Sequence, residues 1–156
     1  MNRVGIGYDI HPLDLTKGNL YLGGVLISNR ISSVGHSDGD ALIHAMIDSL
    51  LGAINKGNIG IMFPENEKNR NRNSEELLCE IFGKIGKYVK IINIDSIVVL
   101  ENIKINPFII NIKENISRML NLDLDKISCK PKSGNGFFKG YVMAEVITLL
   151  EKKEGY

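Results

Sequence analysis

Two kinds of apolar spacing alternate along the chain, and their order limits the folds that it can form. Apolar residues at every second position predict strands, and apolar residues every three or four positions predict helices. The expected strands cover residues 3–9, 20–27, 93–101, 126–132 and 141–152. The expected helices cover residues 38–54, 74–88 and 107–120. This order predicts an α+β or α/β chain with one strand–helix–strand unit near its C-terminus.

Three parts of this assignment depend on local signals. Residues 141–152 also fit a helix, but their dense Val, Ile and Thr favour a strand. Residues 55–73 are polar and contain glycine, which predicts a long loop of the kind that often carries function. Asp38 and Ser74 are the expected N-caps of their helices.

The size and composition of the chain fit one domain over residues 1–156. A chain of 156 residues buries roughly 68–70% of its unfolded surface on folding. Its 44% hydrophobic and 24% charged residues are typical of globular proteins. A net charge of +1 does not suggest nucleic acid or an anionic membrane as the main partner. No apolar run reaches the ~18 residues of a membrane span.

The expected location is a reducing cytoplasm. The N-terminal residues enter a strand pattern at once, which is not the pattern of a signal peptide. Cys79 and Cys129 lack metal-type spacing and are too few for a disulfide framework. A plastid is the alternative location if a transit peptide has been removed.

Acidic and histidine residues in the first third of the chain have the composition of a metal site. Asp9 and His11 are two residues apart at the end of an expected strand, so their side chains share one face. His44 lies in an expected helix, with Asp40 and Asp48 four residues to either side. A catalytic zinc site uses three such protein ligands and leaves one position open. Asp9, His11 and His44 are therefore the candidate ligands.

Each part of this set also has an ordinary structural interpretation. Residues 9–12 alone fit a strand that ends in a turn, and a lone His44 fits a hydrogen-bonded structural histidine. The metal hypothesis depends on the combination of both segments. One carboxylate against Zn²⁺ leaves such a site positive, which suits a phosphate oxygen.

Residues 35–40, Gly-His-Ser-Asp-Gly-Asp, place more polar groups directly before the helix that carries His44. His36 is a candidate acid–base group and Ser37 supplies a hydroxyl, while backbone N–H groups at a helix start favour anions. A capped helix start is the alternative, and it explains Asp38 but not the pairing of His36 with Ser37.

Two glycine-containing turns are further candidates. Residues 57–60, Gly-Asn-Ile-Gly, have the composition to hold a sugar or phosphate against the backbone, although an ordinary turn is the simpler explanation. Residues 130–136, Lys-Pro-Lys-Ser-Gly-Asn-Gly, combine two lysines, a hydroxyl and exposed amides that suit phosphate. A solvated basic turn explains this second segment equally well.

Taken in order, these segments resemble the 2-C-methyl-D-erythritol 2,4-cyclodiphosphate synthase family of the non-mevalonate isoprenoid pathway. The resemblance is dense through about residue 78 and continues as a pattern to the end, with Asn93-x-Asp95, Lys104, Pro107 and Lys130. Its dense part consists of Gly5-x-Gly7-x-Asp9-x-His11, Gly23-Gly24-Val25, residues 36–40 with His44 and Asp48, Leu51-Gly52-Ala53, Gly57-Asn58-Ile59-Gly60, Phe63-Pro64 and Ser74-x-Glu76-Leu77-Leu78.

The resemblance implies a phosphorus–oxygen lyase that acts as a homotrimer, with active sites between subunits. The substrate would be 4-diphosphocytidyl-2-C-methyl-D-erythritol 2-phosphate. Its 2-phosphate attacks the β-phosphate, CMP leaves, and a cyclic diphosphate forms. Each subunit would hold one Zn²⁺ through Asp9, His11 and His44. The expected fold is α+β and ferredoxin-like, with a mixed four-stranded sheet, minor strands and about three helices.

The resemblance also implies roles for individual residues. His36 and Ser133 are the expected catalytic residues, and Asp40 is the expected partner of a zinc-bound histidine. The expected substrate-binding residues are Ser37, Asp48, Asn58, Ile59, Gly60, Phe63, Glu67, Leu100, Lys104 and Lys132.

The sequence departs from the family pattern mainly in its second half. Asn58 stands where the family usually has aspartate, and residues 102–104 read Asn-Ile-Lys in place of Ala-Pro-Lys. Residues 132–135, Lys-Ser-Gly-Asn, replace Thr-Thr-x-Glu, and the arginine that follows in the family is absent. The glutamate that the family associates with a second metal, Mg²⁺ or Mn²⁺, is absent unless Asn135 serves in its place, so this metal is undecided. Lys132 or Lys139 would then supply the positive charge.

Two other functions fit the same residues. A zinc phosphodiesterase would use bound water in place of the internal phosphate nucleophile and would release a non-cyclic product. A non-enzymatic cytidine-nucleotide-binding trimer would bind CDP without turnover. The metal-type residues in the first half favour an enzyme, because cytidine binding alone does not need zinc.

Overall fold

The computed structural model describes residues 1–35, 37–64, 66–67, 69 and 72–153. His36, an expected catalytic residue, lies outside the described residues. Among those described, no helix is long and apolar enough to cross a membrane.

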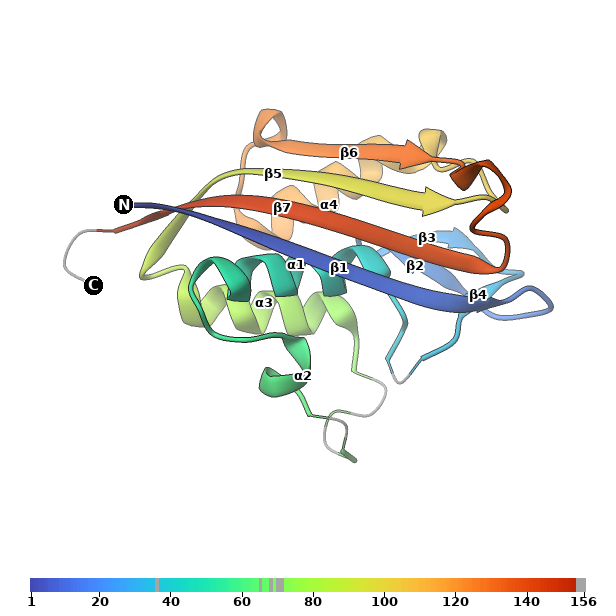
Figure 1. Cartoon of the computed structure of the whole chain (residues 1–156), viewed down its shortest axis with the longest axis horizontal. Coiled ribbons are helices and arrows are strands. Elements are labelled where there is room, and N and C mark those ends of the chain that lie inside the picture. The colour runs from blue at the N-terminus through green and yellow to red at the C-terminus, as the bar shows by residue number, and fades with distance from the viewer. Residues whose placement is uncertain (36, 65, 68, 70–71, 154–156) are drawn as a thin grey trace.

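One twisted sheet forms the main layer of the molecule (Figure 1). Its strands run in the order β4–β1–β7–β5–β6, and only β5 and β6 pair in parallel. The strands are β1 (Asn2–Asp14), β4 (Ser32–Ser33), β5 (Val89–Leu100), β6 (Ile127–Lys132) and β7 (Tyr141–Lys152). A separate two-stranded sheet pairs β2 (Leu20–Leu22) with β3 (Val25–Ser28). The expected α+β class with a mixed sheet is confirmed, but the main sheet has five strands and not four, because the two-residue β4 pairs with β1.

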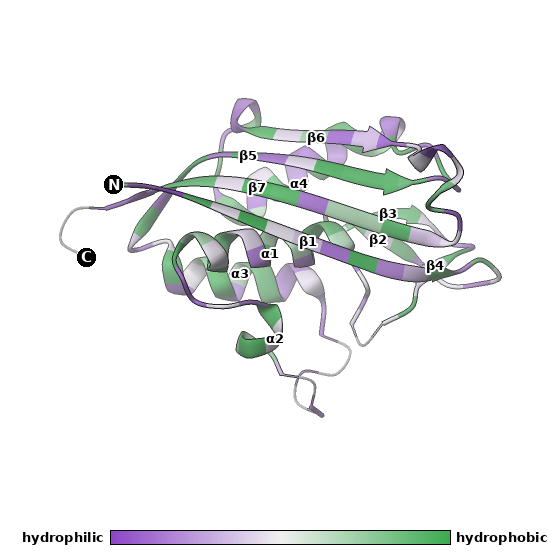
Figure 2. Cartoon of the chain, in the orientation of Figure 1, coloured by the Kyte–Doolittle hydropathy of each residue, from purple (hydrophilic) through white to green (hydrophobic). Residues whose placement is uncertain are grey.

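The helices pack on one face of the main sheet (Figure 1). They are α1 (Ala41–Ala53), the four-residue α2 (Ile59–Met62), α3 (Ser74–Ile85) and α4 (Ile109–Leu120). Short 3-10 turns cover Asn106–Phe108, Leu124–Lys126 and Gly134–Gly136. Helix α1 contacts β1, β7 and α3, so ten of its 13 residues are buried. Figure 2 shows the corresponding hydrophobic character along α1 and the alternation along β1.

The ferredoxin-like part of the expected fold does not agree with the chain order. A ferredoxin-like domain runs β–α–β–β–α–β. Here the long elements run β1, α1, α3, β5, α4, β6 and β7. Because β5 and β6 are neighbours and parallel, a crossover must join them, and α4 is that crossover.

Three local expectations also need correction. The expected single strand over residues 20–27 is a hairpin, because Gly23 and Gly24 adopt positive φ angles of 60° and 76° at its turn. Helix α1 is capped by Asp40, not Asp38, and α3 is capped by Asn73, not Ser74. The expected loop over residues 55–73 contains α2, which Asn58 caps.

Two glycines allow α1 to lie directly against β1. A Cβ atom at Gly5 would lie 1.9 Å from the carbonyl oxygen of Ser49. A Cβ atom at Gly7 would lie 1.8 Å from the carbonyl oxygen of Ala45. Real Cβ atoms do not approach other atoms so closely, so the helix backbone occupies the space of the missing side chains. The strand and the helix from Ala45 to Ala53 are thereby held in one register.

The alternate residues of β1 point to the opposite face of the sheet. Val4, Ile6, Tyr8 and Ile10 are 67%, 62%, 54% and 39% exposed, and Ile147 on β7 is 45% exposed. The helices lie on the other side of the sheet (Figure 1). Alternate residues of a strand share one face and Ile6 pairs with Ile147, so these side chains form an apolar face in the isolated chain. Apolar surface of this extent usually marks an interface.

Replacing Gly7 with alanine is expected to lower the free energy of unfolding of the metal-free protein. The added methyl group must displace the α1 backbone, and overpacking of this kind costs roughly 1–3 kcal/mol. Urea titration measures the change. Gly83→Ala in α3 is the matched control, because nothing lies within 4 Å of a Cβ atom there, and we expect unchanged or higher stability. Wild-type stability of Gly7→Ala would contradict the close contact.

Candidate metal and substrate site

The three expected metal ligands meet where β1 passes the first turn of α1. Asp9 and His11 share the β1 face that carries Gly5 and Gly7, and His44 projects from α1 toward them. Oδ2 of Asp9 lies 2.8 Å from Nε2 of His11 and 2.9 Å from Nδ1 of His44. The two ring nitrogens are 3.3 Å apart. Among the described residues, these form a cluster whose ligand atoms all lie within 4.8 Å of one another.

This donor set fits a tetrahedral cation. Zn–N bonds of about 2.0–2.1 Å at tetrahedral angles place two ligand atoms about 3.3–3.4 Å apart, which is the separation of the His11 and His44 nitrogens. The side chains of Asp9, His11 and His44 are 25%, 16% and 11% exposed. The group is therefore held by its surroundings and is still open on one side.

The charges in the cluster depend on one another. Burial by itself would raise the pKa of Asp9. The hydrogen bonds from His11 and His44, together with the positive charges of the two rings, outweigh burial and lower this pKa to about 2. Burial alone would lower the pKa of His44, but the hydrogen bond and charge of Asp9, with the charges of Asp40 and Asp38, raise it. The metal-free site thus holds a carboxylate against a ring that tends to be protonated, and a bound cation would replace that positive charge.

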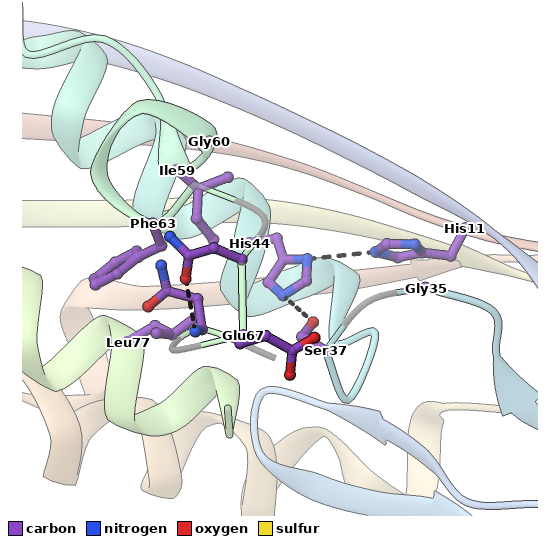
Figure 3. A pocket seen from close by; sticks show the side chains of 11 residues that line it. His11, Gly35, Ser37, His44, Ile59, Gly60, Phe63, Glu67 and Leu77 are labelled. Atoms are coloured by element: carbon purple, nitrogen blue, oxygen red, sulfur yellow. Dashed lines mark hydrogen bonds between the residues drawn. The ribbon is translucent and has the colours of Figure 1, made fainter. Parts of the chain in front are cut away.

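A cavity of about 660 Å³ opens beside the cluster. Figure 3 shows His44 between His11 and Ser37, with Phe63 and Leu77 further along the wall. The described residues that line it are His11, Gly35, Ser37, His44, Ile59, Gly60, Phe63, Asn66, Glu67, Asn69 and Leu77. The structure thus brings five of the expected substrate-binding residues together around the cluster. They are Ser37, Ile59, Gly60, Phe63 and Glu67.

Asp48 and Asn58 build the wall of the cavity that α2 forms. Oδ1 of Asp48 accepts the backbone N–H of Ile59 at 2.7 Å, and Oδ1 of Asn58 accepts that of Ile61 at 3.0 Å. Burial and the charge of Asp9 raise the pKa of Asp48, although the Ile59 hydrogen bond opposes them. Asn58 caps α2 without carrying a charge.

Asp40 ties the start of α1 to the β2–β3 turn. Its fully buried carboxylate accepts backbone N–H groups of Gly23 at 3.0 Å, Gly24 at 2.7 Å and Ile43 at 3.0 Å. Burial nevertheless raises its pKa. Asp40 therefore fixes the helix turn that carries His44, and its expected role as a direct partner of a zinc-bound histidine stays a prediction.

Four expected substrate-binding or catalytic residues lie on other elements. Leu100 ends β5, Lys132 ends β6, and Lys104 and Ser133 follow these strands. They are not among the described residues that line the cavity. Figure 1 shows the end of the sheet where β5 and β6 terminate apart from α2, whose residues Ile59 and Gly60 line the cavity. Oε1 of Glu101 accepts the backbone N–H of Phe138 at 2.8 Å and anchors the turn after β6.

The sequence interpretation gave no functional role to Ser74, which the structure places in contact with His44. The Ser74 hydroxyl lies 2.9 Å from Nε2 of His44 and is fully buried. Asn66, Asn69 and Leu77 also line the cavity without having been expected there. A serine at a helix start normally indicates a cap, so its type and position alone did not reveal this contact.

Comparison with known proteins agrees with this geometry. The model of the YgbB family matches residues 2–150. A relative from Kosmotoga olearia named 2-C-methyl-D-erythritol 2,4-cyclodiphosphate synthase is 52% identical over 154 residues, which cover 97% of this chain and 98% of the relative. The chain therefore belongs to the YgbB family, that is, to the 2-C-methyl-D-erythritol 2,4-cyclodiphosphate synthases.

Two solved structures share the fold over nearly all of the chain. One is a 2C-methyl-D-erythritol-2,4-cyclodiphosphate synthase in a CDP-bound form, with a TM-score of 0.89 and 32% identity over 96% of this chain and all of that chain. The other is the IspF–CDP complex of Plasmodium falciparum, with a TM-score of 0.85 and 35% identity over 98% of this chain and 97% of that chain.

Zinc affinity is expected to fall as the pH is lowered, because His44 must release its Nδ1 proton before it can bind a metal. Its pKa lies above the ordinary 6.5, while Asp9 stays ionised with a pKa of about 2. Below the His44 pKa, each pH unit costs up to about tenfold in affinity. Chelator competition from about pH 8 to about pH 6 measures this effect. Equal affinity across that range would contradict the assignment of His44 as a ligand.

Proposed function

We propose that the protein is a zinc-dependent 2-C-methyl-D-erythritol 2,4-cyclodiphosphate synthase. It converts 4-diphosphocytidyl-2-C-methyl-D-erythritol 2-phosphate to the cyclic diphosphate and releases CMP, as a phosphorus–oxygen lyase. The observation that carries this proposal is the Asp9–His11–His44 cluster at the side of the cavity. Family membership supports it, since the relative from Kosmotoga olearia carries this enzyme's name.

Asp9, His11 and His44 would hold the zinc ion. Bound there, zinc would act as a Lewis acid and orient the substrate phosphates. The protein takes little part in the covalent chemistry of phosphoryl transfer. Its main contributions are to align the reacting phosphates and to stabilise the charge of the transition state. Only one of the three ligands carries a negative charge, so the loaded site stays positive and attracts phosphate.

The described cavity residues would position the rest of the substrate. Its volume of about 660 Å³ lies within the usual range of about 300–1,000 Å³ for ligand sites. The Ser37 hydroxyl lies 3.1 Å from Nε2 of His44 and faces the methylerythritol phosphate in our proposal. Asn58, Ile59 and Gly60 surround the start of α2, where they would contact the ribose. His36 stays a predicted catalytic residue.

A homotrimer would account for two features of the single chain. The exposed apolar face of β1 and β7, which includes Ile6 and Ile147, would be covered by neighbouring subunits. Residues Leu100, Lys104, Lys132 and Ser133 would then complete the cavity of an adjacent subunit, where they would hold the cytidine and its phosphates. Two of the related structures are complexes with CDP, which supports a cytidine nucleotide as the ligand.

The remaining expectations stay predictions. The exposed Lys132 and Lys139 would supply positive charge to the diphosphate, and a second metal, Mg²⁺ or Mn²⁺, stays open. A bacterial cytoplasm is the proposed location. A zinc phosphodiesterase or a cytidine-nucleotide-binding protein without turnover remains the competing function, and no described contact favours either one.

The reaction is tested by ³¹P NMR of the purified protein with zinc and the cytidine substrate. Cyclic diphosphate and CMP are the expected products. His44→Ala should lower kcat/KM by at least about 100-fold, because losing the metal removes several kcal/mol of transition-state stabilisation. Lys126→Ala is the control and should keep full activity, because the Lys126 side chain is 39% exposed and is not among the described residues that line the cavity. A linear monophosphate product would indicate the phosphodiesterase, and CDP binding without product would indicate the binding protein.

The trimer is tested by placing a charge on the apolar face. Ile6→Lys should dissociate the trimer to monomers, because a buried unpaired ammonium group is costly. Light scattering coupled to size-exclusion chromatography measures the mass. Ile110→Lys is the matched control, since Ile110 is 53% exposed on α4 and should leave the trimer intact. A wild-type monomer, or an intact Ile6→Lys trimer, would contradict the assignment of this face.

A further inference from the structure

A chain of polar side chains leads away from the metal cluster toward α3. Ser74, the first residue of α3, places its hydroxyl 2.9 Å from Nε2 of His44. The same hydroxyl donates to Oδ1 of Asp38, and the backbone N–H of Ser74 donates to Oδ2 of Asp38 at 2.9 Å. Asp38 thus binds Ser74 through both carboxylate oxygens, and the Ser74 side chain is fully buried.

The direction of the hydrogen bonds follows from the number of protons. A serine hydroxyl has one proton, and an ionised carboxylate can only accept. The Ser74 proton is therefore committed to Asp38, so the Ser74 oxygen can only accept at its contact with His44. Nε2 of His44 must then be the donor and must carry a proton. The neutral ring has one N–H, so Nδ1, which faces Asp9 and His11, is left with the lone pair.

We infer that Ser74, held by Asp38, is a positioning residue that keeps the proton of His44 on Nε2 and so presents Nδ1 to the metal. This inference rests on the proposed metal site. In the metal-free protein His44 has an acceptor at each nitrogen, Asp9 at Nδ1 and Ser74 at Nε2. A cation that binds Nδ1 displaces only the proton on that side. Partners of this kind commonly change metal affinity by about 10- to 100-fold.

Ser37 is the competing partner for Nε2, at 3.1 Å. Its oxygen accepts the backbone N–H of Gly39 at 3.3 Å. None of its described hydrogen bonds commits the Ser37 proton to a carboxylate, so this hydroxyl can either donate to His44 or accept from it. Ser37 therefore does not determine which ring nitrogen carries the proton, whereas Ser74 does.

Ser74→Ala is the direct test. It is expected to weaken zinc binding by about 10- to 100-fold in chelator competition and to remove the slowly exchanging Nε2 proton signal of zinc-loaded His44 from ¹H–¹⁵N spectra. The helix should persist, because Asn73 provides the cap of α3 by accepting the N–H of Glu75. If Ser74→Ala does not fold, Asp38→Asn tests the inference in its place. This substitution keeps the shape of the side chain but weakens its hydrogen bond from the Ser74 hydroxyl. Asp38→Asn should change both readouts in the same direction.

Two further variants separate this role from a structural one. Ser74→Thr keeps the hydroxyl and should retain the Nε2 proton signal, and Ser37→Ala should retain the signal together with wild-type zinc affinity. Wild-type zinc affinity and an unchanged signal in Ser74→Ala would overturn the inference, as would loss of the signal in Ser37→Ala alone. Wild-type protein that binds zinc but makes no cyclic product would overturn the proposed function and leave this inference standing. Wild-type protein that binds no zinc would overturn both.

Discussion

The close contact between β1 and α1 is the constraint on which the site depends. Gly5 and Gly7 remove two side chains from the inner face of β1, and the backbone of α1 fills their place. The next two residues on that face, Asp9 and His11, lie beside the first turn of the helix, where they meet His44. A bulkier residue at either glycine would separate the strand from the helix, and the ligand atoms would no longer lie within bonding distance of one cation.

Buried hydrogen bonds fix the start of α1 and the orientation of the His44 ring, which packing alone does not determine. Asp40 holds the start of α1 to the β2–β3 turn through three backbone N–H groups. Asp38 holds Ser74, whose hydroxyl contacts His44 from the side away from Asp9. Two neighbouring carboxylates thus have different tasks, one positioning the backbone of the helix and the other acting on the imidazole. The low local dielectric strengthens such networks when each group is satisfied.

The single chain forms one part of the proposed site and also exposes an apolar face on β1 and β7. In the proposed trimer, that face is where the subunit that supplies the other part would bind. The cavity is lined from the N-terminal half of the chain, whereas the basic turn after β6 lies at another end of the sheet. The exposed apolar face of β1 and β7 gives a physical reason for subunits to associate. In the proposed trimer, association would bury this face and bring the basic turn of one subunit to the cavity of another.

The sequence by itself indicated an α+β or α/β class, most long elements and Asp9, His11 and His44 as candidate metal ligands, because alternation and donor type are local properties of the chain. It did not determine the capping residues, since both Asp38 and Asp40 are good caps and only packing against the β2–β3 turn and α3 distinguishes them. It also did not determine the order of the strands or the contact of Ser74 with His44. Both depend on pairing between residues far apart in the chain, which only the tertiary structure decides.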